Sequence, residues 1–304
     1  RHPESFISLK KITKNNLNDV SVDIPENLIS VITGVAGSGK STLIKTGLGK
    51  SEDAIFIDQK AVQATNRSNL LTYMDLFDEV RTFFSKQTGL RKGMFSYNSE
   101  GACPECNGKG VIKTELAFMA DFSQVCEVCN GTRYKKEALE ATVNGYSIAD
   151  VLALTVEEGV TLFENNEKVV TRLKNLEATG LHYMTLGQSL DTLSGGEIQR
   201  LKLSRYLDSN AQDKVFVFDE PTTGLHEDDI PALLSCFEQL IKQHNTVILI
   251  EHNLTMMTHA DWLVDVGPGP GMKGGKILYS GEPQGLLDII NSVTAEHLKR
   301  YTGS

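Results

Sequence analysis

The segment 193–200, Leu-Ser-Gly-Gly-Glu-Ile-Gln-Arg, constrains the fold of this chain more than any other part of it. Ser194 can cap the start of a helix, and Glu197 follows three residues later, so the two residues predict a capping box. Gly195 and Gly196 leave the backbone N–H groups of that helix start accessible, and such a helix start attracts anions. We therefore predict that a helix begins in this segment and that its first turn binds a phosphate.

A second anion site of the same kind lies near the N-terminus. Residues 34–41, Gly-Val-Ala-Gly-Ser-Gly-Lys-Ser, match the pattern G-x-x-x-x-G-K-[ST] and follow an apolar run at 28–33 that predicts a buried strand. Backbone N–H groups of such a loop wrap phosphates, Lys40 would contact the β- and γ-phosphates, and Ser41 would bind Mg²⁺. The predicted nucleotide-binding residues of this loop are Gly34, Gly37, Ser38, Gly39, Lys40, Ser41 and Thr42.

Two carboxylates end a third informative segment. Four apolar residues at 215–218 predict a buried strand that leads directly into Asp219 and Glu220. We predict that Asp219 binds Mg²⁺ and that Glu220 is the general base for the attacking water. Carboxylates often end strands, so the assignment depends on the distance from the glycine motif and on the Pro-Thr-Thr-Gly-Leu that follows.

Two further polar residues follow predicted strands. His252 is predicted to contact the γ-phosphate and to hold the water together with Glu220, although a histidine at a strand end is usually structural. Gln59 is a candidate sensor of Mg²⁺ and water, against the alternative of an ordinary polar loop residue. Phe6 is the one aromatic considered for stacking on adenine, and no other feature supports that role. The predicted catalytic residues are therefore Glu220, His252 and Lys40.

Four cysteines form two Cys-x-x-Cys pairs separated by nineteen residues, which is the spacing of a structural zinc site. A glycine follows each pair at the same offset and permits a tight turn. Zinc would replace a hydrophobic core in an excursion too small to build one. The predicted zinc ligands are Cys103, Cys106, Cys126 and Cys129, whereas the fifth cysteine, Cys236, lies in an amphipathic pattern and is interpreted as a core residue.

The order of predicted elements indicates an α/β fold with a mostly parallel sheet and a large insertion. We expect strands at 28–33, 55–57, 215–218, 247–250 and 276–279, and helical segments at 69–93, 148–154, 169–176, 194–207 and 230–242, with an irregular module at 94–136. The predicted domains are an ATP-binding core in two parts, 1–78 and 206–304, and an inserted signature domain at 79–205 that carries the zinc module at 103–129.

Composition excludes several classes of protein. The longest apolar runs fall short of the roughly 18 residues that a membrane span needs, and no secretory signal is present, so we expect a cytoplasmic protein. The net charge of −9 excludes a basic field over the whole surface, so DNA contacts would need a local patch. The chain begins at Arg1 without a methionine, and we interpret it as a fragment of a larger protein.

The charge of the cysteine module indicates only a modest phosphate-binding face. Residues 101–136 contain five basic and four acidic side chains, and a solvated surface explains them equally well. The basic residues are Lys109, Lys113, Arg133, Lys135 and Lys136, the acidic ones are Glu105, Glu115, Asp121 and Glu127, and four further basic residues precede the module at Arg81, Lys86, Arg91 and Lys92.

Together these motifs resemble the carboxy-terminal nucleotide-binding half of the UvrA family, the damage-sensing subunit of bacterial nucleotide excision repair. The similarity covers nearly the whole chain, and it is specific because transporter cassettes lack a cysteine insertion between the P-loop and the glycine motif. The segments that carry it are 15–17, 33–43, 57–59, 67–69, 95–98, the cysteine quartet, 193–200, 219–226, 250–253 and 260–262.

The resemblance implies an ATP-binding cassette, in which each ATP is clamped between the P-loop of one cassette and the Ser194–Glu197 helix start of another. The second cassette would belong to the same full-length chain or to a second copy. Lys40, Ser41, Gln59 and Asp219 would hold Mg-ATP. The implied function is ATP-dependent DNA binding and damage recognition in excision repair, with a repair partner subunit and without a membrane partner.

Two departures from the family pattern favour a shortened paralogue, of the kind associated with drug or antibiotic self-resistance, over the repair protein. The stretch between Lys40 and Gln59 is short, and residues 98–103 carry Glu100 where the family has basic residues. Two other classes stay open. A transporter cassette would need a membrane partner and a docking groove, and a zinc-knuckle binding module would contain Cys-x-x-Cys-x-Gly-x-Gly repeats but no P-loop.

Overall fold

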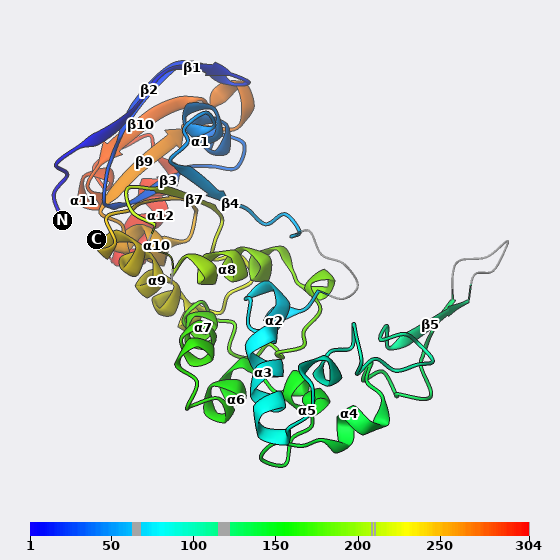
Figure 1. The fold of residues 1–304 in the computed structure, drawn as a ribbon. Coiled ribbons are helices and arrows are strands. Elements are labelled where there is room, and N and C mark those ends of the chain that lie inside the picture. The colour runs from blue at the N-terminus through cyan, green and yellow to red at the C-terminus, as the bar shows by residue number, and fades with distance from the viewer. Residues whose placement is uncertain (63–67, 115–121, 208, 210, 304) are drawn as a thin grey trace. The chain divides into compact units, whose positions relative to one another are not determined.

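The computed structural model describes residues 1–62, 68–114, 122–207, 209 and 211–303. The chain forms two compact units (Figure 1). Unit 1 contains residues 1–60, 178–180 and 195–304, and unit 2 contains residues 61–177 and 181–194. Three residues named from the sequence lie outside the described residues: Arg67, Glu115 and Asp121.

Unit 1 has a central six-stranded sheet with helices packed against it (Figure 1). Its elements are β1 (Phe6–Lys14), β2 (Leu17–Pro25), β3 (Ile29–Thr33), α1 (Lys40–Leu48), β4 (Ala54–Ile57), α8 (Gly195–Tyr206), β7 (Val215–Asp219), η3 (Glu227–Asp229), α9 (Ile230–Lys242), β8 (Thr246–Ile250), α10 (Leu254–His259), β9 (Trp262–Gly267), η4 (Gly271–Lys273), β10 (Lys276–Gly281), α11 (Pro283–Leu286) and α12 (Val293–Thr302).

The strand order of the central sheet is β10-β9-β3-β8-β7-β4. Four of its five strand pairs are parallel, and only β10 runs antiparallel to its neighbour β9. The predicted α/β fold with a mostly parallel sheet is therefore confirmed. This topology brings the carboxyl ends of β3, β4, β7 and β8 to one edge, which is where a parallel sheet places its ligands.

Both faces of the sheet are buried, which explains the uninterrupted apolar runs of its strands. In β7, Phe216 and Phe218 join a core that includes α9, α10 and α12, whereas Val215 and Val217 join a second core with α1 and the β1–β2 pair. The Phe218 ring packs against Phe237 of α9 at a centroid distance of 4.9 Å. The alternation of the two cores along each strand follows the two-residue period of β-structure.

The antiparallel pair β1–β2 was not predicted. Its strands bury only about every second or third residue, and register shifts interrupt the pairing between Leu9 and Lys14, so the sequence lacks a clean alternating pattern. The predicted strands at 28–33, 55–57, 215–218, 247–250 and 276–279 correspond to β3, β4, β7, β8 and β10 within one or two residues at each end.

Unit 2 is mainly helical and carries one small hairpin. Its elements are α2 (Leu70–Tyr73), α3 (Phe77–Thr88), η1 (Lys92–Phe95), β5 (Val111–Thr114), β6 (Phe122–Val125), α4 (Lys136–Glu140), α5 (Ile148–Ala153), α6 (Val156–Leu162), α7 (Glu167–Ala178, whose last residue belongs to unit 1) and η2 (Leu190–Thr192).

The predicted helical stretch 69–93 is divided in the structure into α2, α3 and η1. The break between α2 and α3 occurs at Asp75, whose φ of 55° is incompatible with a continuing right-handed helix. Side-chain caps begin two later helices of this unit, at Ser147 of α5 and Thr155 of α6, which both form capping boxes.

The two units differ in extent from the domains predicted at 1–78, 79–205 and 206–304. The helix α8 belongs to unit 1 because it packs on the sheet: Lys202 Nζ lies 2.8 Å from the Asp58 carboxylate that follows β4. Residues 61–78 belong to unit 2, where the Leu71 N–H donates to Leu186 at 3.2 Å. Across the described part of the chain, every helix is too short or too polar to traverse a lipid bilayer.

Candidate functional site

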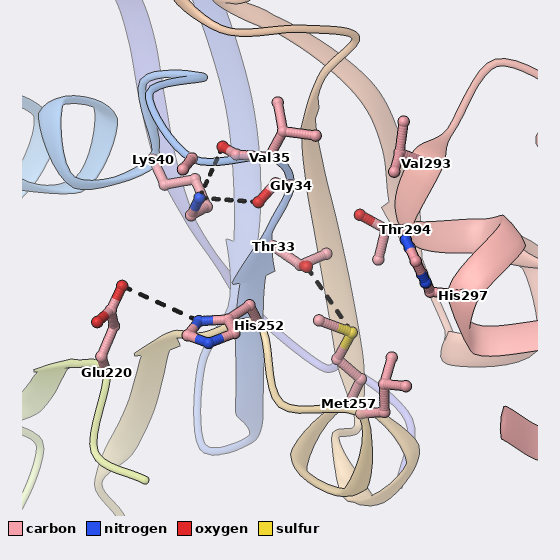
Figure 2. Close-up of a pocket in the computed structure, with 12 residues that line it drawn as sticks. Thr33, Gly34, Val35, Lys40, Glu220, His252, Met257, Val293, Thr294 and His297 are labelled. Atoms are coloured by element: carbon pink, nitrogen blue, oxygen red, sulfur yellow. Dashed lines mark hydrogen bonds and ion pairs between the residues drawn. The ribbon is translucent and has the colours of Figure 1, made fainter. Parts of the chain in front are cut away.

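The loop between β3 and α1 is held in a conformation that requires its glycines. Gly34 has a φ of 129°, and a Cβ atom there would lie 2.0 Å from the Val266 carbonyl oxygen. Gly39 has a φ of 111° immediately before α1 begins. The Lys40 ammonium donates to the carbonyl oxygens of Gly34 at 2.8 Å and Val35 at 3.0 Å (Figure 2). The cation of the predicted P-loop therefore lies at its own loop, beside the backbone that would bind a phosphate.

The pKa of Lys40 is lowered from its ordinary value, because burial outweighs the attraction of nearby acids. Burial lowers the pKa of its ammonium, and the negative charges of Glu220, Asp265 and Asp219 act in the opposite direction. A phosphate anion at this loop would add to the second effect and favour the charged form of Lys40.

The predicted Mg²⁺ ligands meet where β7 ends. Ser41 Oγ lies 3.3 Å from Asp219 Oδ1, and Lys45 Nζ lies 2.7 Å from Asp219 Oδ2. Because β4 is the sheet neighbour of β7, Gln59 reaches the same point, and its amide donates to the carbonyl oxygens of Asp219 and Glu220 at 3.4 Å. A hydroxyl, a carboxylate and an amide oxygen are ligands that suit Mg²⁺. Lys45 is the residue of this group that sequence reasoning missed.

The other predicted P-loop residues contact the turn between β1 and β2. The Asn16 amide donates to the carbonyl oxygens of Ser38 at 3.0 Å and Gly37 at 3.4 Å, and the Asn15 amide donates to Thr42 Oγ1 at 3.3 Å. The Ser38 hydroxyl is fully buried and has no hydrogen-bond partner among the described residues. Asn16 lies in the segment 15–17 that carries part of the family resemblance, but its contact with the P-loop was not predicted from the sequence.

The aromatic residue considered for adenine stacking lies elsewhere on the hairpin. Phe6 pairs with Pro25 at the opposite end of β1 from the Asn15–Asn16 turn, and its ring packs edge-on against Trp262 at 5.9 Å. A nine-residue strand spans roughly 26 Å between its first and last residues. The structure therefore separates Phe6 from the P-loop, and the idea that it stacks on adenine is wrong.

Glu220 and His252 face each other across a cavity beside Lys40 (Figure 2). Their closest atoms, Glu220 Oε1 and His252 Nδ1, are 3.9 Å apart, and both side chains are at least half exposed. Glu220 adopts a φ of 53°, an unusual conformation for a residue with a side chain, so its backbone is held by its surroundings. The cavity measures about 470 Å³ and is lined by Thr33, Gly34, Val35, Ala36, Lys40, Glu220, His252, Leu254, Met257, Val293, Thr294 and His297.

The two glycines at the start of α8 lie close to the same strand ends. A Cβ atom on Gly195 would lie 3.0 Å from the Gln59 side chain, and a Cβ atom on Gly196 would lie 2.5 Å from the Thr223 carbonyl oxygen. Gly196 is thus needed for the close approach of α8 to the turn after β7. This contact within unit 1 ties the glycine motif to the loop that carries Glu220.

Gln199 is a buried polar residue of α8 that sequence reasoning missed. It is 1% exposed, and its amide donates to the carbonyl oxygens of Ile57 at 2.8 Å and Asp219 at 3.2 Å. It joins the ends of β4 and β7 to the helix. Glu197 lies in the first turn of α8 and Ser194 belongs to unit 2, and their capping box stays a prediction.

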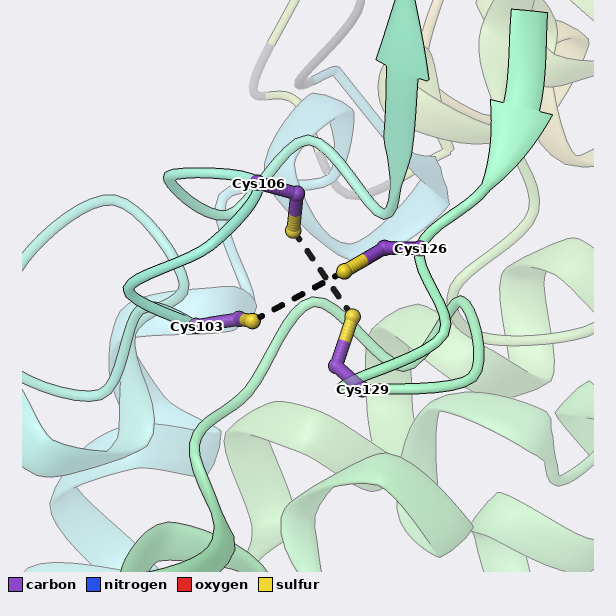
Figure 3. A group of neighbouring side chains, drawn as sticks. All are labelled: Cys103, Cys106, Cys126 and Cys129. Carbon is purple, nitrogen blue, oxygen red and sulfur yellow. Dashed lines mark hydrogen bonds between the residues drawn. The ribbon is translucent and has the colours of Figure 1, made fainter.

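The four paired cysteines of unit 2 converge on one point (Figure 3). All four are buried, and their sulfur atoms lie within 4.8 Å of one another, with Cys103–Cys126 at 4.0 Å and Cys106–Cys129 at 3.7 Å. A tetrahedral zinc site with Zn–S bonds of about 2.3 Å has S–S edges of roughly 3.8 Å. The donor set and its size therefore fit one zinc ion.

The surroundings of the quartet favour a thiolate at Cys106, whereas burial raises the pKa of Cys129 to about 12. The Gly110 N–H donates to Cys106 Sγ at 3.2 Å. Burial acts to raise the pKa of Cys106, but this N–H and the neighbouring thiols outweigh it and lower the pKa to about 7. Hydrogen bonds of this kind commonly orient the ligands of structural metal sites. Cys236 belongs to α9 in unit 1, is 1% exposed and lies in the core of that unit, as expected.

Three of the four basic residues that precede the module form ion pairs with two acids of the same unit. Asp78 pairs with Arg81 at 2.7 Å and with Lys92, and Glu100 pairs with Arg91 at 2.9 Å. These pairs lie on the surface and contribute little to stability. Their effect is to reduce the positive charge that this face offers to a phosphate backbone.

Comparison with known proteins agrees with this geometry. Residues 17–223 match the family described as ABC transporter. The chain is 42% identical over 324 aligned residues to UvrABC system protein A of Staphylococcus aureus (strain COL), with 96% of this chain and 34% of that protein covered. It is 40% identical to UvrABC system protein A of Bacillus subtilis (strain 168), with 98% and 35% covered.

A solved structure shows the same similarity. The crystal structure of UvrA2 from Deinococcus radiodurans superposes with a TM-score of 0.88 at 38% identity, over 99% of this chain and 40% of that one. The chain thus spans about a third of the length of the curated relatives it matches.

Proposed function

Because the chain belongs to the ATP-binding cassette family and, within it, to the UvrA family, we propose that it is a Mg²⁺-dependent ATP hydrolase that acts on DNA. The observation that carries the proposal is the meeting of Lys40, Glu220 and His252 around one cavity, with Asp219 and Ser41 beside it. This set contains a phosphate-binding cation, a base and a partner for the base.

Each residue has a distinct role in the proposed reaction. The loop that contains Lys40 binds the phosphates, and Ser41, Gln59 and Asp219 are the residues that would hold Mg²⁺, which neutralises phosphate charge when bound. Glu220 accepts the proton of the attacking water. His252 lies across the cavity from Glu220 and holds the water in place.

The glycine motif completes the site of a second cassette. Ser194 is exposed at the start of α8, where Gly195 and Gly196 leave the helix N-terminus open to an anion. We propose that this helix start contacts an ATP held by the P-loop of another cassette, in the same full-length chain or in a second copy. ATP turnover by this chain therefore depends on its association with a second cassette.

The cysteine quartet is proposed to bind one structural zinc ion, and the module that it folds is proposed to contact DNA. The relatives carry the name UvrABC system protein A, which supports a role in nucleotide excision repair together with a repair partner subunit. We propose damage recognition in that pathway. The cysteine quartet between the P-loop and the glycine motif argues against a transporter cassette, and the cavity around Lys40 argues against a zinc-knuckle module without a nucleotide site.

One observation favours the second candidate, a UvrA-like self-resistance protein that acts on a drug bound to DNA. Arg91 pairs with Glu100, a residue of the segment that leads into the first cysteine, so the cationic charge that would meet phosphates there is reduced. Binding of damaged duplex, with and without ATP, tests both candidates. Release of damaged duplex on ATP addition supports the repair assignment, and affinity only for drug-bound duplex supports the second one.

Turnover of ATP per chain is expected to rise with protein concentration from nanomolar to micromolar, because two cassettes must meet to complete a site. Steady-state phosphate release over a dilution series measures it. The inactive variant Lys40→Ala keeps an intact helix start at Ser194. Adding it to dilute wild-type protein should therefore raise ATP turnover per wild-type chain. The double variant Lys40→Ala/Ser194→Arg is the matched control and should not. High turnover at nanomolar protein that is independent of concentration would reject pairing between chains.

A further inference from the structure

Glu251 is a fully buried carboxylate at the end of β8, and the proposed mechanism assigns it no role. Four groups donate hydrogen bonds to it. Oε1 accepts from the Thr222 N–H at 3.1 Å and from the Thr222 hydroxyl, and Oε2 accepts from the N–H groups of His252 at 2.6 Å and Asn253 at 3.1 Å. Both oxygens of the carboxylate are therefore fully used.

The donors belong to two separate loops of the candidate site. Thr222 lies in the turn that follows Glu220, and that turn is closed by a hydrogen bond from the Thr223 N–H to the Glu220 carbonyl oxygen at 3.1 Å. His252 lies in the segment that joins β8 to α10, and its Nδ1 is 3.6 Å from Glu251 Oε2. One carboxylate thus ties the backbone beside the predicted base to the backbone of the predicted water-holding histidine.

The same residue is also fixed to the P-loop strand. The Glu251 N–H donates to the Ile32 carbonyl oxygen at 3.1 Å, two residues before Gly34. The Glu220 N–H donates to the Ile250 carbonyl oxygen at 2.9 Å, which supports the unusual φ of Glu220. Hydrogen bonds around Glu251 therefore join the strand that leads into the P-loop, the turn that contains Glu220 and the segment that contains His252.

We propose that Glu251 is a positioning residue for ATP hydrolysis, which holds Glu220 and His252 in the arrangement that the chemical step requires. The inference rests on the proposed function of this site. Glu251 does not face the cavity, so it acts through the two loops and not on the nucleotide. Nucleotide affinity, which depends on the P-loop, should be nearly independent of it.

A glutamine cannot replace this carboxylate. Gln keeps the size of the side chain but exchanges one acceptor oxygen for an NH₂ group, which would face N–H donors of Thr222 or of His252 and Asn253. One pair of donors would lose its acceptor, and the loop that contains it would shift. Misplacement of catalytic groups by about 1 Å lowers turnover by about 10²-fold.

The chain offers a matched control at the other end of the same strand. Asn245 is also fully buried, accepts from the Lys214 N–H at 3.0 Å and donates to Ala211 at 2.8 Å, and it lies outside the lining of the cavity. Asn245→Ala removes a comparable group of buried side-chain hydrogen bonds. It should lower the melting temperature without changing the ratio of kcat to nucleotide affinity.

The experiment measures kcat, KM and the Kd of a fluorescent ATP analogue for purified wild-type protein, Glu251→Gln and Asn245→Ala. For Glu251→Gln we expect kcat to fall about 10²-fold, with the Kd within about threefold of wild type. An unchanged kcat would overturn the proposal, as would a parallel loss of kcat and affinity like that of a destabilised protein. Wild-type protein without turnover at any concentration would reject the proposed function itself, whereas active wild type with active Glu251→Gln rejects only the positioning role.

Variants of Thr222 test only the hydrogen bonds between Glu251 and the turn after Glu220. They leave the hydrogen bonds from His252 and Asn253 to Glu251 in place. Thr222→Ser keeps the hydroxyl that donates to Glu251, and Thr222→Val keeps the volume of the side chain but removes that donor. We expect Thr222→Ser to keep wild-type kcat and Thr222→Val to lose roughly tenfold, with unchanged nucleotide affinity. Equal turnover of the two variants would contradict the proposed role of the carboxylate.

Discussion

Replacing Glu220 with Gln is expected to lower kcat for ATP by roughly 10³-fold while nucleotide affinity stays within a few-fold of wild type. The amide keeps the size of the side chain but cannot accept the proton of the attacking water. Half of the Glu220 side chain is exposed, so the substitution should cost little stability. Steady-state phosphate release and binding of a fluorescent ATP analogue measure the two quantities separately.

Glu52→Gln provides the control for Glu220→Gln, because Glu52 is an exposed glutamate in the turn before β4 of the same unit. It should have wild-type kcat and KM. Since Glu220→Gln blocks the step that separates paired cassettes, it should also accumulate as an ATP-bound pair in size-exclusion chromatography. A kcat within tenfold of wild type would show that another group accepts the proton. A loss confined to KM would place Glu220 in ground-state binding.

The parts of the fold that carry motifs could be predicted from the sequence because their signals are local. A buried parallel strand is a continuous apolar run, and the glycines and carboxylates that follow β3 and β7 mark where those strands end. The cysteine quartet was predictable for the same reason, since the spacing within each pair is fixed by one tight turn. Whether Glu220, His252 and Gln59 carry the assigned roles stays a prediction.

The elements that were missed depend on contacts between distant segments. The β1–β2 pair exposes much of its surface, and its strands become recognisable only when they pack over α1 and the sheet. Asn16 is an ordinary turn residue in the sequence and becomes part of the P-loop only because the hairpin turn meets Ser38.

The contacts of buried polar residues are even harder to predict from the sequence. Glu251 and Gln199 lie inside recognised motifs, yet nothing in their spacing distinguishes a fully buried acceptor from a solvated side chain. Their partners come from other strand ends: Thr222 for Glu251, and Ile57 for Gln199. The order of strands in the sheet decides these contacts, and a single sequence read by pattern does not supply that order.

Loss of one cysteine ligand is expected to unfold the cysteine module and to leave the nucleotide-binding unit intact. The four cysteines form the buried cluster at the centre of the module, and among the described residues of 101–135 Tyr134 is the one large side chain that is fully buried, so a metal ion would supply most of what holds the module together. Binding of structural zinc contributes on the order of 10 kcal/mol in small zinc domains, which exceeds what the β5–β6 hairpin could supply by itself. Cys106→Ser should therefore reduce the zinc content from one ion per chain to almost none.

The measurements for Cys106→Ser are zinc content, limited proteolysis and nucleotide affinity. We expect rapid cleavage between 101 and 135 in the variant, with wild-type affinity for the ATP analogue, because Lys40 and its loop lie in the other unit. Cys236→Ser is the matched control: it also removes a buried thiol, but one that lies in the core beneath α9, so one zinc ion and an intact module should remain. Freshly purified wild-type protein that lacks zinc and still resists cleavage there would show that the quartet folds without a metal, and the clustering of its sulfur atoms would then need another cause.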